Sequence, residues 1–405
     1  MIKSNLILKD NIHLKNFNVE TKKKFFKKLN KIFSKIKKDI QSNFKTLNVL
    51  NKNFKFNFKV QDLKKFKKYK TVAIIGMGGS ILGSEAIYNF FQINIKKKFY
   101  FFNDLNENKI LDFKKKENLS KVLFIIISKS GNTVETLSNF FALNIIKKNS
   151  KNIIIISEKK NNLLAVLAKK LNLFYVEHKD YIGGRYSVLS EVGMLPACIM
   201  GVNISKLRSK ILNCLKDKNK IFLKNSTVKF AHLMQSKKYN NIIFLNYAPE
   251  LEKFLYWCQQ LVSESLGKKD MGFLPVISSA PKDHHSLLQL YLDGPKDKIF
   301  NIFNIKKKSK EKIKINKNIE FKSFLNKKKL SSIKDAQRKA LIKTFTKNKI
   351  PFRIFQVESV NEEVLGKLFS YFIIETIIVA KLLNVDPFNQ PAVEQVKIYT
   401  KEFLN

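Results

Sequence analysis

The chain has 405 residues, of which 44% are hydrophobic, and it carries a formal net charge of +45. This length exceeds one typical hydrophobic core, so we expect two domains. The charge suggests nucleic-acid binding at first sight, but the excess is almost wholly lysine, and Asn, Ile and Phe are abundant as well. A bias toward A/T-rich codons explains all four enrichments, so we predict no specific nucleic-acid partner.

The first 50 residues are rich in lysine, and their apolar side chains between residues 25 and 33 recur at helical spacing. They predict an N-terminal helical segment. Short apolar runs then alternate with helix-like segments up to about residue 205. The predicted strands are 71–75, 99–102, 122–127, 153–157 and 174–176, and the predicted helices are 81–91, 137–146 and 161–171. This alternation is typical of a parallel α/β sheet with right-handed crossovers.

A charged helical stretch over 200–224 predicts a joint between domains, after which the alternation resumes. The later predicted strands are 242–246, 273–277, 299–302 and 352–356, and the predicted helices are 250–266 and 362–383. Residues 305–335 are dense in Lys and Ser, and we interpret them as solvated loop and helix with little chemistry. We therefore predict α/β domains over 51–205 and 206–405, each a parallel sheet between two layers of helices, after the helical segment 1–50.

The cysteines and the apolar stretches indicate the compartment. Cys198, Cys214 and Cys258 are widely spaced and form no CxxC metal pair or disulfide framework, so we expect reduced thiols. The first 15 residues lack the apolar core of a signal peptide. The most apolar late stretch, 368–379, contains Glu375 and is too short to span a bilayer. We expect a cytoplasmic protein with no membrane partner.

The stretch Ser128–Thr136 lies between a strand-like run and a helix-like run, and it combines hydroxyl residues with Lys129 and Gly131. Backbone N–H groups at a helix start carry partial positive charge, and short hydroxyls add donors to phosphate oxygens. An ordinary helix cap is the alternative, because Ser and Thr cap helices. The interleaved lysine and glycine favour an anion cradle.

A glycine-rich turn, Gly76–Ser80, also links a predicted strand to a predicted helix in the same domain. Its GxGG pattern is not the full dinucleotide fingerprint and is weak evidence alone. In parallel α/β sheets both turns lie at the carboxyl edge of the strands, where ligands bind. Together they predict a site for a phosphorylated polyhydroxyl ligand.

Three other motifs carry polar groups, each with an ordinary alternative. Arg185 lies in a glycine-rich loop and suits either an oxyanion or a surface ion pair. Glu264 lies near a helix end at Gly267, where the helix dipole disfavours an acidic residue, so it is either functional or merely exposed. His284 and His285 are adjacent and cannot both face one site on a helix; one is either a proton-transfer group or a packing histidine.

The last motif is a turn that leads into a helix near the end of the chain. Gln390, Glu394 and Lys397 are spaced four and three residues apart, with Pro391 at the first helical turn. This spacing predicts one shared helix face. A surface Glu–Lys pair is the alternative.

In this order, the motifs resemble those of the phosphoglucose isomerase family, over about four-fifths of the chain. The most specific matches are Gly183–Ser187 and the pattern of Asn389, Gln390, Val393, Glu394 and Lys397. The resemblance implies two sugar-isomerase (SIS-like) domains, each with a parallel five-stranded sheet. It also implies a homodimer with shared active sites, and the interconversion of glucose 6-phosphate and fructose 6-phosphate in glycolysis and gluconeogenesis, with no cofactor or metal.

The resemblance also implies roles for individual residues. Glu264 matches the general base that moves a proton between C1 and C2 through a cis-enediol, and Arg185 matches the arginine that stabilises the enediolate. His285 matches the ring-opening histidine, which the neighbouring subunit supplies in this family, and Lys397 matches the lysine that assists it. The matching substrate contacts are Gly79, Ser80, Ser128, Lys129, Ser130, Thr133, Gln260 and Gln390, with Lys129 at either the phosphate or the reacting end.

The chain departs from the family pattern in being shorter, in Pro391–Ala392 where many members have a small residue and Gly, and in His284 where many have Gln. None of these changes removes a matching catalytic group. Two alternatives remain: another enzyme on the same scaffold, such as a dual glucose/mannose-6-phosphate isomerase, and a basic protein that binds RNA or membranes. Gln390 favours the glucose-specific enzymes, and the scattered lysines disfavour a binding protein.

Overall fold

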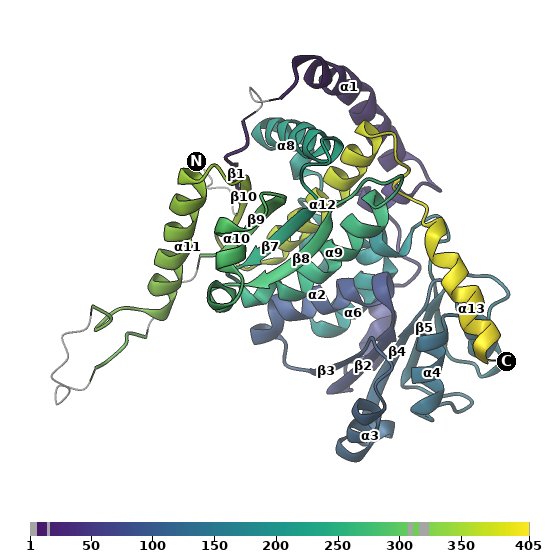
Figure 1. The fold of residues 1–405 in the computed structure, drawn as a ribbon. Coiled ribbons are helices and arrows are strands. Elements are labelled where there is room, and N and C mark those ends of the chain that lie inside the picture. Colours follow the sequence, from purple (N-terminus) through teal and green to yellow (C-terminus); the bar gives the residue numbers. More distant parts are fainter. Residues whose placement is uncertain (1–5, 14–16, 307–310, 316–323, 405) are drawn as a thin grey trace.

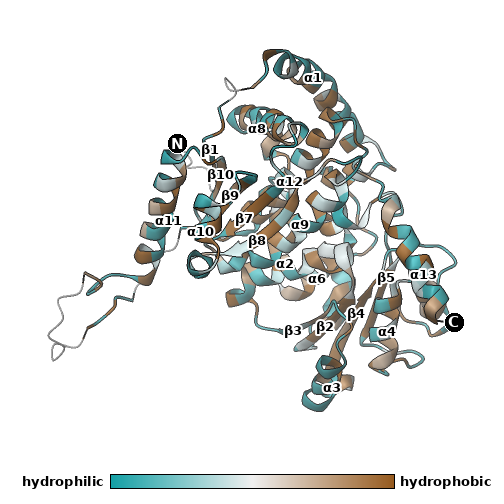
Figure 2. Ribbon diagram, in the orientation of Figure 1, coloured by the Kyte–Doolittle hydropathy of each residue, from teal (hydrophilic) through white to brown (hydrophobic). Residues whose placement is uncertain are grey.

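Two five-stranded sheets organise the chain, with helices between them and on their outer faces (Figure 1). The computed structural model describes residues 6–13, 17–306, 311–315 and 324–404. Figure 2 shows the strands of both sheets as mostly hydrophobic, which is typical of sheets that are covered on both faces. The two predicted α/β sheets are thus confirmed, while the exact domain limits at residues 50 and 205 stay a prediction.

The first sheet is parallel throughout and has the strand order β3-β2-β4-β5-β6. Its strands are β2 (Thr71–Gly76), β3 (Lys98–Phe102), β4 (Val122–Ile127), β5 (Ile153–Ser157) and β6 (Phe174–Glu177), and its helices are α2 (Leu82–Phe91), α3 (Glu107–Lys116), α4 (Val134–Ala142), α5 (Leu163–Lys170) and α6 (Glu191–Met200). All five predicted strands are confirmed. The helix predicted over 137–146 is observed as α4 and begins three residues earlier. It also ends earlier, because Asn144 adopts a left-handed φ of 51° just after it.

The second sheet has the strand order β1-β10-β9-β7-β8. Its strands are β7 (Asn241–Asn246), β8 (Leu274–Ser279), β9 (Lys298–Ile305), β10 (Phe352–Val357) and β1 (Leu6–Asp10). Its helices are α9 (Glu252–Leu266), α10 (Leu288–Asp293), α11 (Leu330–Lys347) and α12 (Glu362–Leu382), and the remaining helices of the chain are α1 (Val19–Gln41), α7 (Ile204–Arg208), α8 (Asp217–Gln235) and α13 (Glu394–Leu404). The four strands predicted here are confirmed.

The prediction that residues 1–50 are helical is wrong for β1, and the second sheet is not wholly parallel. β1 pairs antiparallel with β10, with Leu6 opposite Val357. Five residues of mixed polarity are too short a run to show strand periodicity, so the sequence did not reveal them. The strand covers the edge of β10 that would otherwise expose unpaired N–H and C=O groups. The helix in this segment is confirmed as α1.

One continuous core joins the two sheets. Side chains alternate along β4, so Leu123, Ile125 and Ile127 face the same cluster as Phe244 of β7 and the helices α2, α9 and α12. The outer face of the first sheet packs against α3, α4 and α5, and that of the second against α10 and α11. Among the described residues, no helix combines the length and apolarity needed to cross a membrane.

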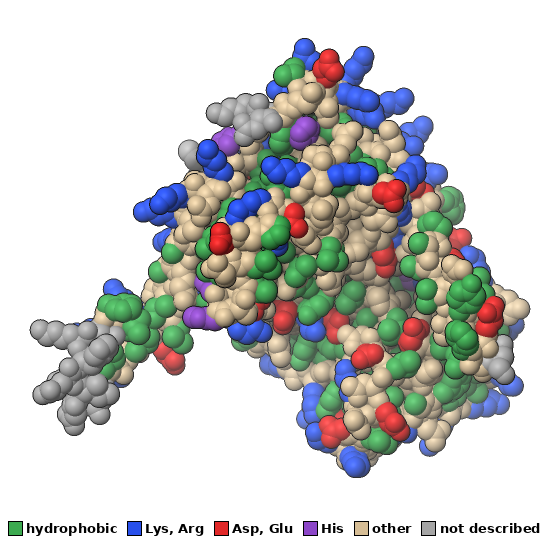
Figure 3. All heavy atoms as spheres, viewed as in Figure 1, with side chains coloured by type: hydrophobic (Ala, Val, Ile, Leu, Met, Phe, Trp, Pro, Cys, Tyr) green, Lys and Arg blue, Asp and Glu red, His purple; other side chains and the backbone are tan. Residues whose placement is uncertain are grey.

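Lysine and arginine side chains are spread over the surface shown in Figure 3, from α1 to α3, rather than gathered into one patch. This dispersal agrees with the interpretation of the lysines as solvated surface charge.

Candidate active site

The switch point of the first sheet brings the two glycine- and hydroxyl-containing loops together. β2 lies between β3 and β4, because the chain goes from β2 to one side and then crosses to the other. In parallel α/β sheets, ligands bind in the crevice at the carboxyl ends of the strands at such a switch point. Gly76 at the end of β2 is in register with Ile127 at the end of β4. The loops that follow, 77–80 and 128–133, therefore begin at the same level.

The loop after β4 is held in a tight turn by its own hydroxyls. The Oγ of Ser128 lies 2.9 Å from the Oγ1 of Thr133 and accepts a hydrogen bond from the Gly131 N–H at 3.2 Å. The Oγ of Ser130 lies 3.3 Å from the same Thr133 hydroxyl. Gly131 has φ +66°, and a Cβ there would lie 1.8 Å from the Oδ1 of Asn162. Three hydroxyls thus converge at the N-terminus of α4, an arrangement that suits an anion.

Lys129 points away from these hydroxyls. Its ammonium donates to the carbonyl of Asp180 at 2.7 Å and lies 3.5 Å from the carboxylate of Glu158. Next to this pair, His178 is buried, and burial lowers its pKa to about 4, with the charge of Lys129 acting in the same direction. In this conformation Lys129 serves the wall of the crevice rather than its centre.

The glycine turn after β2 packs backbone against backbone. This turn forms the 3₁₀ segment η4 (Gly78–Ser80), which lies against the segment η7 (Gly184–Leu189) that carries Arg185. A Cβ on Gly79 would lie 2.2 Å from the carbonyl carbon of Gly184, and a Cβ on Gly78 would lie 2.8 Å from the Nε2 of Gln260. Glycine is required at both positions so that η7 and α9 reach the crevice.

Arg185 is the centre of the site and is 3% exposed. Its guanidinium donates to the Oγ of Ser265 (2.8 Å), Glu264 Oε2 (3.0 Å), Gln390 Oε1 (3.0 Å), and the carbonyls of Pro387 and Asn389 (3.1 Å to the latter). All five N–H donors of a guanidinium are therefore used within the protein. Arg185 can act on a ligand through its charge, and it fixes Glu264 and Gln390 side by side.

Glu264 projects from the last turn of α9, one turn after Gln260. Its Oε1 accepts a hydrogen bond from Gln260 Nε2 at 2.8 Å, its Oε2 is bound by Arg185, and its side chain is 29% exposed. The helix ends at Gly267, as predicted. The Oε1 of Gln260 is buried and has no hydrogen-bond partner among the described residues. The crevice thus offers an oriented carboxylate and an acceptor available for a ligand donor.

Sequence reasoning missed the residues that anchor the segment 386–389. Lys268 donates to the carbonyls of Asp386 and Asn389, the latter at 2.7 Å, and burial lowers its pKa. The hydroxyl of Tyr186 donates to the carbonyl of Pro387 at 2.7 Å. Lys268 and Tyr186 stand beside Gly267 and Arg185 in the sequence, but nothing local indicates that they converge on one distant segment.

The structure does not bring His285 or Lys397 to this carboxylate. His285 is exposed on η10 (Lys282–His285), after β8, and its neighbour His284 bonds the hydroxyl of Tyr247 at 2.7 Å. Lys397 lies on α13 and pairs with Glu394 at 2.7 Å, with 59% of its side chain exposed. The structure therefore shows the alternative named for this motif, a surface ion pair between Glu394 and Lys397.

The prediction that Gln390 shares a helix face with Glu394 and Lys397 is wrong. Gln390 precedes the 3₁₀ segment η11 (Pro391–Val393) and has a ψ of 63°, outside the helical region. Its side chain instead turns to Arg185. Pro391 does open the helical turn, as predicted.

Acidic, histidine and cysteine side chains do not gather in threes anywhere in the described residues in a way that could hold a metal ion. The polar groups of the crevice are hydroxyls, amides, one carboxylate and one guanidinium, which suits recognition of a hydroxylated, anionic small molecule.

Comparison with known proteins gives the family. The model of the family described as phosphoglucose isomerase matches residues 30–405. A glucose-6-phosphate isomerase from Methanocaldococcus jannaschii is 35% identical over 354 residues, covering 83% of this chain and 86% of that relative. Among solved structures, a hypothetical protein from Thermus thermophilus superposes with a TM-score of 0.82 at 22% identity, covering 98% of this chain and all of the other. A glucose-6-phosphate isomerase from Chlamydia trachomatis gives 0.70 at 17% identity, over 85% and 72% of the two chains.

Proposed function

Because this chain belongs to the phosphoglucose isomerase family, we propose that it interconverts glucose 6-phosphate and fructose 6-phosphate by moving one proton between C1 and C2. The observation that carries the proposal is the placement of Glu264 between Gln260 and Arg185, on the same crevice as the Ser128–Thr133 loop. Aldose–ketose isomerisation needs a carboxylate base and positive charge near the developing enediolate.

The phosphate has a place that is separate from the reacting carbons. The hydroxyls of Ser128, Ser130 and Thr133 and the start of α4 supply donors for its oxygens, with Ser80 from the neighbouring loop. Binding energy at this end orients the sugar without touching the bonds that change. The unpartnered Oε1 of Gln260 is an acceptor for a sugar hydroxyl.

The proton transfer is assigned to Glu264. Its carboxylate takes the proton from C2 of the open-chain aldose and returns it to C1, while Arg185 stabilises the enediolate through its charge; over the whole step O1 gains a proton and O2 loses one, so that the C2 hydroxyl becomes the ketone. Arg185 uses all five of its N–H donors within the protein, so it has no donor left for a direct hydrogen bond to the enediolate. Gln260 and Arg185 also keep the carboxylate oriented toward the crevice.

Ring opening is assigned to His285 of a second copy of the chain, with Lys397. Two observations support a homodimer with shared sites. His285 is exposed and is not hydrogen-bonded to any group of the crevice among the described residues. α13 has no buried residue, and its apolar side chains form an exposed patch on that side of the molecule (Figure 3): Val396, Ile398, Tyr399, Phe403 and Leu404, next to Val393 of η11. Such a patch is typical of a surface covered by a partner.

Substitution Glu264→Gln tests the base. We expect kcat to fall by at least about a thousandfold, since an amide cannot accept the proton, while sugar-phosphate binding survives because Gln keeps the acceptor for Arg185. A coupled assay with glucose 6-phosphate measures the first effect, and equilibrium binding measures the second. The same assay of the wild type with mannose 6-phosphate tests the alternative of a dual glucose/mannose-6-phosphate isomerase, which would form fructose 6-phosphate from both substrates at comparable rates.

Glu252→Gln, at the start of the same helix, is the matched control and should retain full activity. An active Glu264→Gln enzyme would contradict the base assignment. Wild-type protein without isomerase activity would contradict the proposed function as a whole.

A further inference from the structure

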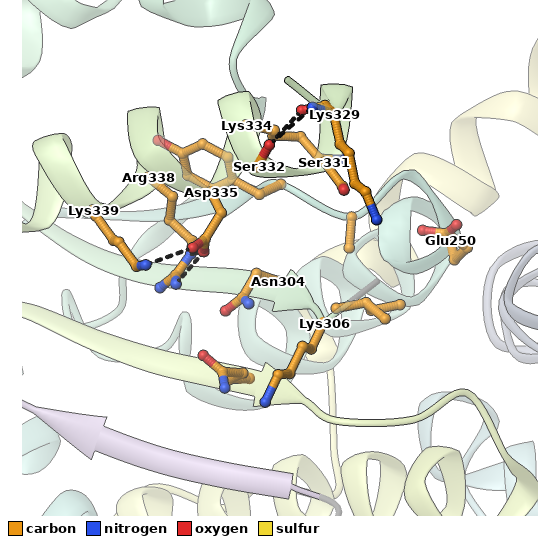
Figure 4. A pocket seen from close by; sticks show the side chains of 14 residues that line it. Glu250, Asn304, Lys306, Lys329, Ser331, Ser332, Lys334, Asp335, Arg338 and Lys339 are labelled. Carbon is orange, nitrogen blue, oxygen red and sulfur yellow. Dashed lines mark hydrogen bonds and ion pairs between the residues drawn. The ribbon is translucent and has the colours of Figure 1, made fainter. Parts of the chain in front are cut away.

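The second sheet has its own cavity at the position that corresponds to the candidate active site in the first sheet. β7 lies between β8 and β9, so the chain also switches direction at the carboxyl ends of β7 and β9. A cavity of about 600 Å³ opens there, between the ends of β7, β9 and β10 and the first three turns of α11 (Figure 4). This volume is in the range of small-molecule sites.

Asn304, at the carboxyl end of β9, gives the cavity a buried polar group without a partner. Its side chain is labelled in Figure 4, where it projects from the sheet into the space below α11. The residue is 7% exposed, and its Oδ1 has no hydrogen-bond partner among the described residues. A buried acceptor that has lost water and found no donor is destabilising, so a ligand hydroxyl or N–H fits this position.

The charge of the cavity selects for an anion. Its lining contains more basic than acidic side chains: Lys306, Lys329, Lys334, Arg338 and Lys339 against Glu250 and Asp335. Asp335 binds Arg338 at 2.6 Å and Lys339 at 2.8 Å, and Lys306 binds Glu358 at 3.2 Å, so the cations around the cavity still outnumber the carboxylates. Lys329 forms no ion pair with the described residues, and its side chain extends into the cavity.

The N-terminus of α11 adds donors at the same end. This helix has 18 residues, so its dipole is developed, and Lys329 and Ser331 stand at its start on the cavity wall. Ser332 is already bound to the backbone of Lys329, which closes the first turn. A tetrahedral anion next to Lys329 and Ser331 would meet the positive end of the helix.

We propose that this cavity is a second ligand site, which binds a small phosphate monoester that carries hydroxyl groups. The phosphate lies at the start of α11 against Lys329, and a hydroxyl of the ligand donates to Asn304. None of the residues assigned to the candidate active site lines this cavity. The proposal therefore goes beyond the isomerase and does not depend on it.

Equilibrium dialysis of the full chain with radiolabelled glycerol 3-phosphate tests the site. We expect two classes of sites in the wild type. Ser130→Ala combined with Thr133→Val should remove the class that belongs to the first sheet. Lys329→Gln should weaken the other class by about tenfold, because it removes a charge-assisted contact, and should leave isomerase activity unchanged. Lys115→Gln, on the exposed face of α3, is the matched control for the lost charge.

Asn304→Leu keeps the side-chain volume but removes the acceptor, and we expect about tenfold weaker binding of the same probe. Lys329→Gln leaves the core untouched, so its result stands even where the leucine variant is less stable. Unphosphorylated glycerol should not bind. A single class of sites that the Ser130/Thr133 pair abolishes would overturn the proposal, as would equal weakening by Lys115→Gln and Lys329→Gln.

Discussion

Arg185 has a role that no other side chain in this site could fill. Its planar fork reaches Ser265 and Glu264 on α9 as well as the segment that contains Gln390. A lysine has three donors on one nitrogen and could not span these positions. The chain uses arginine at only four positions, 185, 208, 338 and 353. The arginine in the glycine-rich loop therefore marks a position where geometry, and not charge alone, is required.

His178 should make the protein less stable in acid. Its pKa in the folded chain is about 4, below the ordinary value of 6.5, mainly because it is buried. Between these values the unfolded chain binds a proton that the folded chain does not, so stability falls as the pH is lowered through this window. The loss at pH 4 relative to pH 7 should be about 3 kcal/mol.

Urea unfolding at both pH values measures this effect. The drop should be smaller by about that amount in His178→Gln. His13→Gln, at an exposed position, should follow the wild type. An identical drop in the wild type and in His178→Gln would contradict the assignment.

At the scale of elements, the site depends on two short 3₁₀ segments that touch through glycines. η4 ends at Ser80 and η7 begins at Gly184, and their backbones approach closely enough that no Cβ fits on Gly79. This contact sets where η7 presents Arg185 relative to the end of β2. The helices contribute in the same way, because α9 carries both Gln260 and Glu264 on one face, four residues apart.

Gly79→Ala should therefore destabilise the protein and displace the site. The new methyl group would lie 2.2 Å from a backbone carbon, which cannot move as a flexible side chain would. We expect a loss of about 1–3 kcal/mol in the free energy of unfolding, together with a raised KM.

Gly184→Ala is the matched control, since its Cβ would meet only the Cα of Gly79, at 3.9 Å. Its free energy of unfolding should change by less than about 0.5 kcal/mol. Equal effects of the two alanines, measured by urea unfolding, would show that the close contact does not set the stability.

At the scale of the whole molecule, the two sheets share one topology in four of their five strands and lie around a common core. In each sheet the chain adds its next strand on one side of a first strand and the following strand on the other side, and this marks the switch point: β2 in the first sheet and β7 in the second. The inner faces of both sheets pack on the same helices, so the halves are not independent units. The candidate active site lies at the first switch point and the proposed second ligand site at the other, while His285, which follows β8, is exposed.

Mixed dimers test the sharing of active sites. Glu264→Gln and His285→Asn should each be inactive alone, because every site in either homodimer lacks one group. Dissociation and reassociation of an equal mixture should restore about a quarter of the wild-type activity, since half of the dimers carry one complete site. Activity that stays absent in a mixture shown to exchange subunits would contradict the shared site, and so would an active monomer.

The sequence by itself determined all strands of the two sheets except β1, the main helices and the loops that carry the candidate site. Each of these is a local pattern: a run of apolar β-branched residues, a 3.6-residue period, or a turn rich in Gly and Ser. The residues matched to the family, from Gly79 to Lys397, were also visible locally, because each family motif is a short contiguous stretch of the chain. Assignment of their catalytic roles stays a prediction.

Only the tertiary structure decided how distant segments meet. β1 pairs with a strand almost 350 residues away, Gln390 turns to Arg185 instead of joining its helix, and Lys129 turns to Glu158. The Lys- and Ser-rich composition of residues 305–335 indicates only a solvated loop and helix, yet Lys306, Lys329 and Ser331 line the cavity of the second sheet. In each case the partner of a side chain or strand is set by which distant groups the packed core brings within hydrogen-bond distance. The local periodicity of the sequence does not encode which distant groups become neighbours.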